Sequence, residues 1–143
     1  MTTDEPPYLV KLGEAQTAVV RALFDSLPRE GWASCAVEYR EAANMAESIV
    51  TLTDTNNEAT VVKTPPAMVG ELMDLRDLMS AQGEGAWLSI DFTVTPDGKC
   101  VFDYNYDERP RWTVQPTDET YIEDLRRHPR PSETIPDWYP RAN

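Results

Sequence analysis

The sequence predicts an α+β domain, an antiparallel sheet of about five strands with helices packed on one face. Segments with helical and β periodicity follow one another in the order α-β-β-β-α-β-β-α, without the regular alternation of strand and helix that a parallel sheet needs. Short stretches of turn residues separate neighbouring β-segments, as is typical of antiparallel strands. The length indicates one domain over residues 1–143, with extended termini at 1–7 and 129–143.

The first expected helix covers residues 8–28. Its apolar residues recur at spacings of three and four, which places them on one face that can pack on a sheet. The stripe contains Leu12, Val19, Leu23 and Leu27. The pair Pro6-Pro7 marks the start of this helix, and Pro28 with Gly31 marks its end.

Three β-segments follow and predict an antiparallel meander. Residues 32–41 alternate between apolar and polar side chains, residues 47–53 are rich in Ile, Val and Leu, and residues 59–63 form a shorter third segment. Turn residues at 42–46 and 54–57 separate them.

A second helix is expected from Thr64 to about Gln82, with Thr64 as the N-cap and a proline in the first turn. Its apolar stripe is rich in methionine and contains Met68, Leu72, Leu75 and Met79. Such a stripe either packs in the core or forms a groove that binds a partner helix.

The stretch from Gly83 to Asp107 predicts a β-hairpin. Proline, aspartate and glycine at 96–98 favour a tight turn, which sets Thr95 opposite Lys99 and fixes the register. One face of the hairpin is then apolar and buried. The other face pairs Thr93 with Val101, Asp91 with Asp103, Ser89 with Asn105, and Trp87 with Asp107.

The pair Asp91 and Asp103 destabilises this hairpin slightly, because like charges lie directly across the ladder. The face is either a solvated acidic surface or a platform for a basic protein or a metal ion. A spacing of about 5 Å across the ladder fits two-carboxylate glycoside hydrolysis. An open sheet face, however, offers no pocket to raise one pKa, and a metal needs more oxygen ligands than Ser89 and Asn105 supply. We therefore expect no cofactor and no metal.

The C-terminal part predicts a short helix and an anchored tail. Thr117 caps a helix that ends before Pro129. The proline-rich tail contains Ile135, Trp138 and Tyr139, which we expect to pin it to the domain.

Composition excludes several classes of function. The net charge of -12 disfavours binding to nucleic acid and to anionic membranes, and favours basic protein partners. Neither a transmembrane run nor a signal peptide is apparent, so we expect a cytoplasmic protein. Cys35 and Cys100 lack zinc-ligand spacing and are expected in the core. His128 is the only histidine and serves no nucleophile motif, so we expect no enzyme.

The run W-L-S-I-D-F-T-V-T-P-D-G-K-C-V-F-D-Y-N-Y-D, then D-E-T-Y-I-E-D-L-R-R-H-P-R and I-P-D-W-Y, resembles the YezG-like immunity proteins of bacterial polymorphic toxin systems. The similarity covers residues 83–139. It implies a small cytoplasmic antitoxin that binds and neutralises a cognate secreted toxin domain, often a nuclease. The resemblance supplies no catalytic motif and no contact residues.

The hairpin, rather than the resemblance, predicts the partner-binding residues. They are acidic and aromatic residues and one asparagine of the outward side and its continuation: Trp87, Asp91, Asp103, Asn105, Asp107 and Glu108, with Trp112 at the rim. Two alternatives stay open. A regulatory or secretion-chaperone module would bind a helix through exposed methionines of residues 68–79. A small hydrolase would use Asp91 and Asp103 in a concave site.

Overall fold

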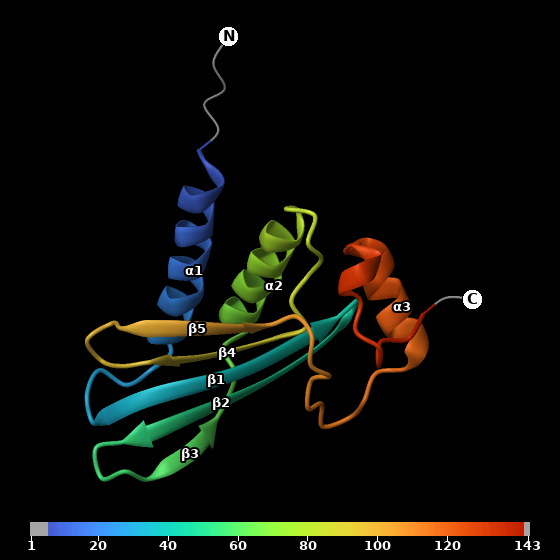
Figure 1. Ribbon diagram of the computed structural model, residues 1–143. Helices are drawn as coiled ribbons and strands as arrows, with labels where there is room; N and C mark the ends of the chain where they lie inside the picture. Colours follow the sequence, from blue (N-terminus) through green and yellow to red (C-terminus); the bar gives the residue numbers. More distant parts are fainter. Residues whose placement is uncertain (1–5, 142–143) are drawn as a thin grey trace.

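The computed structural model describes residues 6–141 and confirms the α+β class and the expected order of elements. Its five strands form one antiparallel sheet in the order β3-β2-β1-β4-β5 (Figure 1). The elements are α1 (Tyr8–Phe24), β1 (Trp32–Ala42), β2 (Met45–Asp54), β3 (Ala59–Val62), α2 (Pro66–Ser80), β4 (Ser89–Val94), β5 (Cys100–Asn105), α3 (Asp118–Arg127) and a 3-10 turn at Ser132–Thr134.

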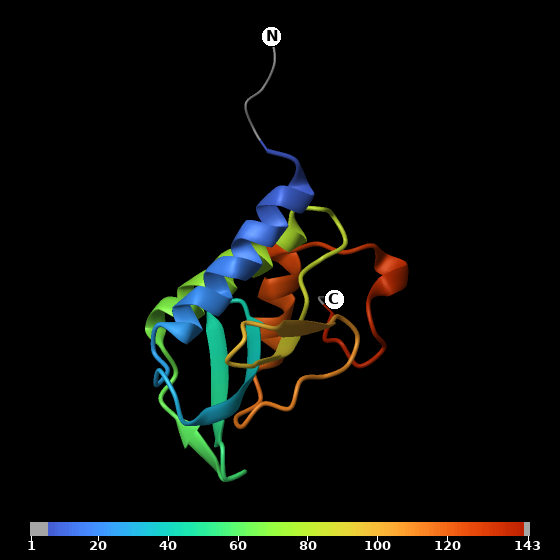
Figure 2. The same ribbon diagram turned by 90° about the vertical axis from the view of Figure 1, so that its left-hand side faces the viewer.

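All three helices lie on the same side of the sheet (Figures 1 and 2). Helices α1 and α2 cover the sheet, and α3 stands at the end where β1 turns into β2. Among the described residues, no helix covers the opposite face of the sheet (Figure 1). We call this uncovered face the outer face.

The main core lies between the sheet and the two helices α1 and α2. It forms because alternate residues of each strand point to the helix side, where they meet the apolar stripes of both helices. Its largest buried members include Leu23, Tyr39, Met68, Leu72, Leu75, Trp87 and Ile90. Cys35 belongs to this core and Cys100 packs against it, and both are free thiols, as expected.

A second core joins α3 and the C-terminal tail to the end of the sheet. Its buried members are Ala42, Leu88, Trp112, Tyr121 and Tyr139. The Tyr139 hydroxyl donates to the carbonyl of Tyr121 (2.9 Å), and the Trp138 ring meets Tyr121 edge-on at 5.6 Å. The expected anchoring of the tail by its aromatic residues is therefore confirmed.

Two helix boundaries differ from the expectation. Helix α1 ends at Phe24 instead of residue 28, because the hydroxyl and amide of Ser26 both bind the Leu23 carbonyl and turn the chain. Helix α2 begins at Pro66, and Thr64 does not cap it. Pro65 and Pro66 have no amide hydrogen, so the first turn leaves fewer donors for a threonine side chain to satisfy. The predicted cap Thr117 is confirmed, since its hydroxyl accepts from the amide of Thr120 (3.3 Å).

The predicted hairpin register is confirmed over the whole β4–β5 ladder, from Ser89 opposite Asn105 to Val94 opposite Cys100. Gly98 takes the positive φ of 84° that closes the turn, and its amide donates to the carbonyl of Thr95 (2.9 Å). The same register carries Asp91 and Asp103 to the outer face.

Candidate functional site

A row of three carboxylates crosses the outer face. Asp91 lies opposite Asp103 on β5, as predicted, and opposite Glu38 on β1 as well. Asp91 and Asp103 are both exposed. We call Glu38, Asp91 and Asp103 the carboxylate row. Glu38 was missed as a site residue, although it stands on the polar side of the first β-segment.

The middle member of the row, Asp91, has a raised pKa. Partial burial raises the pKa of the Asp91 carboxyl, and the charges of Glu38 and Asp103 raise it further, while Arg111 and Arg40 oppose the rise. The charged form of Asp91 is therefore disfavoured in the free protein, and an added cation beside it would be attracted.

Two arginines, Arg40 and Arg111, lie near the row and place positive charge beside its carboxylates. The Arg40 side chain is only 6% exposed and binds Glu47 (Nη2 to Oε1, 2.6 Å). Its Nη1 lies 3.5 Å from Glu38. Arg111 is exposed and lies in the loop that follows β5. Since Arg40 is held mainly by Glu47, the row keeps an excess of negative charge.

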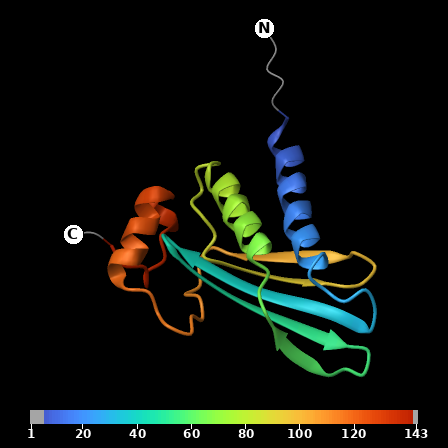
Figure 3. The same ribbon diagram turned by 180° about the vertical axis from the view of Figure 1, so that it is seen from behind.

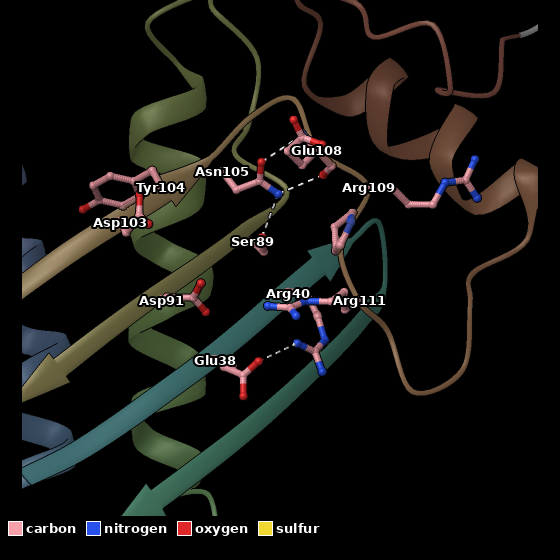
Figure 4. Close-up of a pocket in the computed structure, with 11 residues that line it drawn as sticks. Glu38, Arg40, Ser89, Asp91, Asp103, Tyr104, Asn105, Glu108, Arg109 and Arg111 are labelled. Carbon is pink, nitrogen blue, oxygen red and sulfur yellow. Dashed lines mark hydrogen bonds and ion pairs between the residues drawn. The ribbon is translucent and has the colours of Figure 1, made fainter.

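A cavity of about 320 Å³ opens beside the carboxylate row (Figure 4). The loop at residues 108–111 forms its far wall, and the backbone amide of Thr113 holds this loop by donating to Glu47 (3.0 Å). The sequence predicted an open face without a pocket, and this expectation was wrong. The lining includes Glu38, Arg40, Asp91, Asp103, Glu108 and Arg111.

Asn105 lines the cavity and shapes this loop. Its side-chain amide donates to the Ser89 hydroxyl (2.9 Å) and to the Glu108 carbonyl (2.8 Å). Its side-chain oxygen accepts from the backbone amides of Asp107 (3.3 Å) and Glu108 (2.9 Å). The side chain is thus held by bonds within the chain while it lines the cavity, and its role as a contact residue stays a prediction.

Trp87 and Trp112 were predicted on the accessible side, and both predictions were wrong. Trp87 is 0% exposed and belongs to the main core, and Trp112 is 7% exposed and belongs to the second core. The strict alternation begins only at Ser89, because the chain bends at Leu88. Extending the hairpin pattern to residue 87 therefore assigned Trp87 to the wrong face.

The two remaining predicted residues, Asp107 and Glu108, are both exposed but lie at different hollows. Glu108 lines the cavity beside the carboxylate row. Asp107 lines another hollow with Tyr106 and Arg130, and its carboxylate pairs with Arg130 at 3.0 Å. Asp91, Asp103, Asn105 and Glu108 are therefore the predicted residues that the structure brings together around one cavity.

The methionine stripe of α2 packs in the main core. Met68 is fully buried, Met79 is partly buried, and Met73 at 39% exposure is the accessible member. A helix-binding regulatory or chaperone module would need this stripe on the surface. The structure contradicts that requirement and confirms the core-packing interpretation.

Comparison with known proteins gives no family: no protein-family model matches the sequence, and no curated protein matches it. Within residues 6–141, no helix is long and apolar enough to cross a bilayer. The same residues contain no group of three or more His, Cys, Asp or Glu side chains that could hold a metal ion. The geometry of the outer face is thus the main guide to function.

Proposed function

We propose that this chain is a cytoplasmic immunity protein that binds a cognate secreted toxin domain and neutralises it without catalysing a reaction. The observation that supports the proposal most is the carboxylate row on a sheet face that no helix covers. Side-by-side carboxylates cost stability in the free protein, and a basic partner would offset that cost. The resemblance of residues 83–139 to immunity proteins points to the same role.

The net charge of the chain determines which classes of partner it attracts and which it repels. A net charge of -12 attracts basic protein surfaces over long distances and speeds their encounter. The same charge repels nucleic acid and anionic lipid. A nuclease toxin binds phosphate groups through a basic cleft, so an acidic face that covers this cleft would block entry of the substrate.

Replacing Asp91 and Asp103 together by asparagine should weaken toxin binding while leaving the fold intact. We expect affinity to fall at least about tenfold and to depend less steeply on salt, because two steering charges are lost. The free energy of unfolding at pH 7 should stay unchanged or rise by under about 1 kcal/mol, because a like-charge pair is removed. Titration calorimetry at several salt concentrations measures the first effect, and urea unfolding measures the second.

The matched control removes two charges from the helix side. Glu14 on α1 and Asp74 on α2 are both exposed, and Glu14→Gln with Asp74→Asn changes the net charge equally. This control should leave the affinity within about twofold, because distant surface charges are screened. Equal losses in the two double variants would show that only net charge matters and would remove Asp91 and Asp103 from the interface.

Affinity should also fall as pH is lowered. The raised pKa of Asp91 means that its carboxyl takes up a proton at a higher pH than an ordinary aspartate. A basic partner binds the ionised form, so complex formation must release that proton in acid. We expect the parent to lose more affinity between neutral and mildly acidic pH than the Asp91→Asn variant. Parallel slopes for the two proteins would contradict this prediction.

A second candidate is a small hydrolase that uses Asp91 and Asp103. The cavity beside these residues and the raised pKa of Asp91 favour it, since a general acid must hold its proton. Hydrolysis of a glycoside substrate that is lost in Asp91→Asn would support this candidate. Rescue of cells from a toxin domain found in a neighbouring reading frame would support the immunity role, and failure of the parent to rescue them would contradict it.

A further inference from the structure

A second row of residues runs beside the carboxylate row and crosses every strand of the sheet. Its members are opposite one another in the successive ladders and belong to β3, β2, β1, β4 and β5 in turn. They are Val61, Thr51, Ala36, Thr93 and Val101. We call this the small-residue row, since two threonines and an alanine lie between two valines.

The small-residue row lies on the outer face and is open to solvent. The valines at its ends, Val61 and Val101, are 69% and 78% exposed, and Ala36 and Thr93 are exposed as well. The helices lie on the opposite face (Figure 3). Four strand spacings of about 4.8 Å give the row a length of about 19 Å. A protein partner could therefore contact it along the whole width of the sheet.

The two rows meet in a shallow hollow. Its lining includes Ala36 and Thr93 from the small-residue row, Glu38 and Asp91 from the carboxylate row, and Arg111 from the loop. The rows are two residues apart along each strand, which corresponds to about 7 Å. A lysine or arginine side chain has a similar reach, with an apolar stem and a charged head. The hollow therefore matches such a side chain in both length and chemistry.

We propose that the bound protein seats a lysine or arginine side chain in this hollow. The stem lies over Ala36 and Thr93, and the charged head lies between Glu38 and Asp91. Apolar residues around this anchor cover Val61 and Val101. The inference rests on the proposed function and specifies the surface that the toxin domain must present, a cation surrounded by apolar side chains.

Charge complementarity selects a basic partner over a second copy of this chain. Each copy carries a net charge of -12, and two outer faces brought together would oppose their carboxylate rows. Arg40 cannot serve as the anchor in such a dimer, because its side chain is buried and bound to Glu47. A foreign cation meets the carboxylates of Glu38 and Asp91. Two positive charges compete with it, Arg111 in the hollow and Arg40, whose Nη1 lies 3.5 Å from Glu38.

The test fills the hollow without altering its charge. Thr93→Tyr adds a ring at an exposed strand position where aromatic residues are well tolerated. The probe is a catalytically inactive variant of the toxin domain used in the rescue experiment, and calorimetry measures its binding. We expect at least about a tenfold loss of affinity with an unchanged salt dependence, because the anchor is blocked while the carboxylates remain.

Two further variants sharpen the test. Thr17→Tyr makes the same exchange at an exposed position of α1 and should leave the affinity within about twofold. Arg111→Gln removes the like charge beside the seat and should raise the affinity several-fold. Unchanged thermal unfolding midpoints for all three variants confirm that the fold is kept.

The outcomes separate this inference from the proposed function. If the parent binds the toxin domain and Thr93→Tyr binds it equally well, the anchor site is wrong while the immunity role stands. A loss caused by Thr17→Tyr, or a loss caused by Arg111→Gln, would also overturn the anchor site. If the parent does not bind the toxin domain at all, both the proposed function and the anchor are overturned.

Discussion

We expect Asp124→Asn to lower the free energy of unfolding by about 3–5 kcal/mol, because it removes the closer of the two carboxylates that pair with the buried Arg76. Arg76 on α2 is fully buried. Its two terminal nitrogens bind the two oxygens of Asp124 on α3 at 2.7 and 2.8 Å, and its Nε donates to the Trp87 carbonyl at 2.8 Å. A bidentate pair of this kind is strong only while both members keep their charge.

The pair is part of a larger buried network that joins the two cores. Glu41 lies 3.5 Å from Arg76 and accepts a hydrogen bond from the Tyr39 hydroxyl at 2.5 Å. Asp124 also accepts from the backbone amide of Ala43 at 2.7 Å, in the turn between β1 and β2. Burial raises the pKa of Glu41, and Arg76 opposes the rise. Loss of Asp124 thus disturbs the contacts that α3 makes with both α2 and the sheet.

Urea unfolding of a double-mutant cycle checks this prediction. Arg76→Met and Asp124→Asn should each be costly, whereas the variant that carries both substitutions should recover part of the loss, because neither member of the pair is then left as a charge without the other. Glu123→Gln, which breaks an exposed pair with Arg126 and Arg127, should change stability little. A cost for Asp124→Asn as small as that of Glu123→Gln would contradict the role of the buried pair.

The part of the fold that local chemistry determines could be predicted from the sequence. The hairpin register follows from the Pro-Asp-Gly turn and from two strands that alternate in phase, and the ladder from Ser89 to Asn105 confirms it. The cap at Thr117 is local in the same sense. Both depend on residues that are close in the sequence.

Features that depend on distant contacts could not be predicted. Glu38 faces Asp91 because β4 pairs directly with β1, although β2, β3 and α2 lie between them in the sequence. No local pattern specifies that pairing. Residues 108–111 form a loop after β5, and Pro110 explains why they form no strand. The return of this loop to the outer face depends on the bonds of Asn105 and on the contact of Thr113 with Glu47.

The position of Arg76 in the sequence indicates that its side chain is buried. It stands four residues after Leu72 and next to Leu75, so it falls on the apolar face of α2. A charged residue in a core-facing stripe indicates a buried partner, because an unpaired charge is too costly there. The partner Asp124 is 48 residues away and could not be identified from spacing.

Trp87→Ala should lower the free energy of unfolding by about 3–5 kcal/mol, since it removes the largest fully buried side chain. The Trp87 ring meets Tyr39 edge-on and Tyr104 at a tilt, with both ring centroids 6.0 Å away. The guanidinium carbon of Arg76 lies 5.9 Å from the Trp87 ring. The cavity left by alanine would therefore loosen both the aromatic packing and the surroundings of the buried ion pair.

Such a variant would also fail to protect cells from a toxin, and this failure alone could be mistaken for the loss of a contact. Trp87→Phe separates the two explanations. It keeps most of the ring packing and should cost roughly 1–3 kcal/mol. Because the side chain does not reach the surface, the affinity of the folded protein for the toxin domain should stay within about twofold of the parent. Calorimetry below the unfolding temperature measures that affinity. A tenfold loss in Trp87→Phe with little change in unfolding would place Trp87 in the interface and contradict its burial.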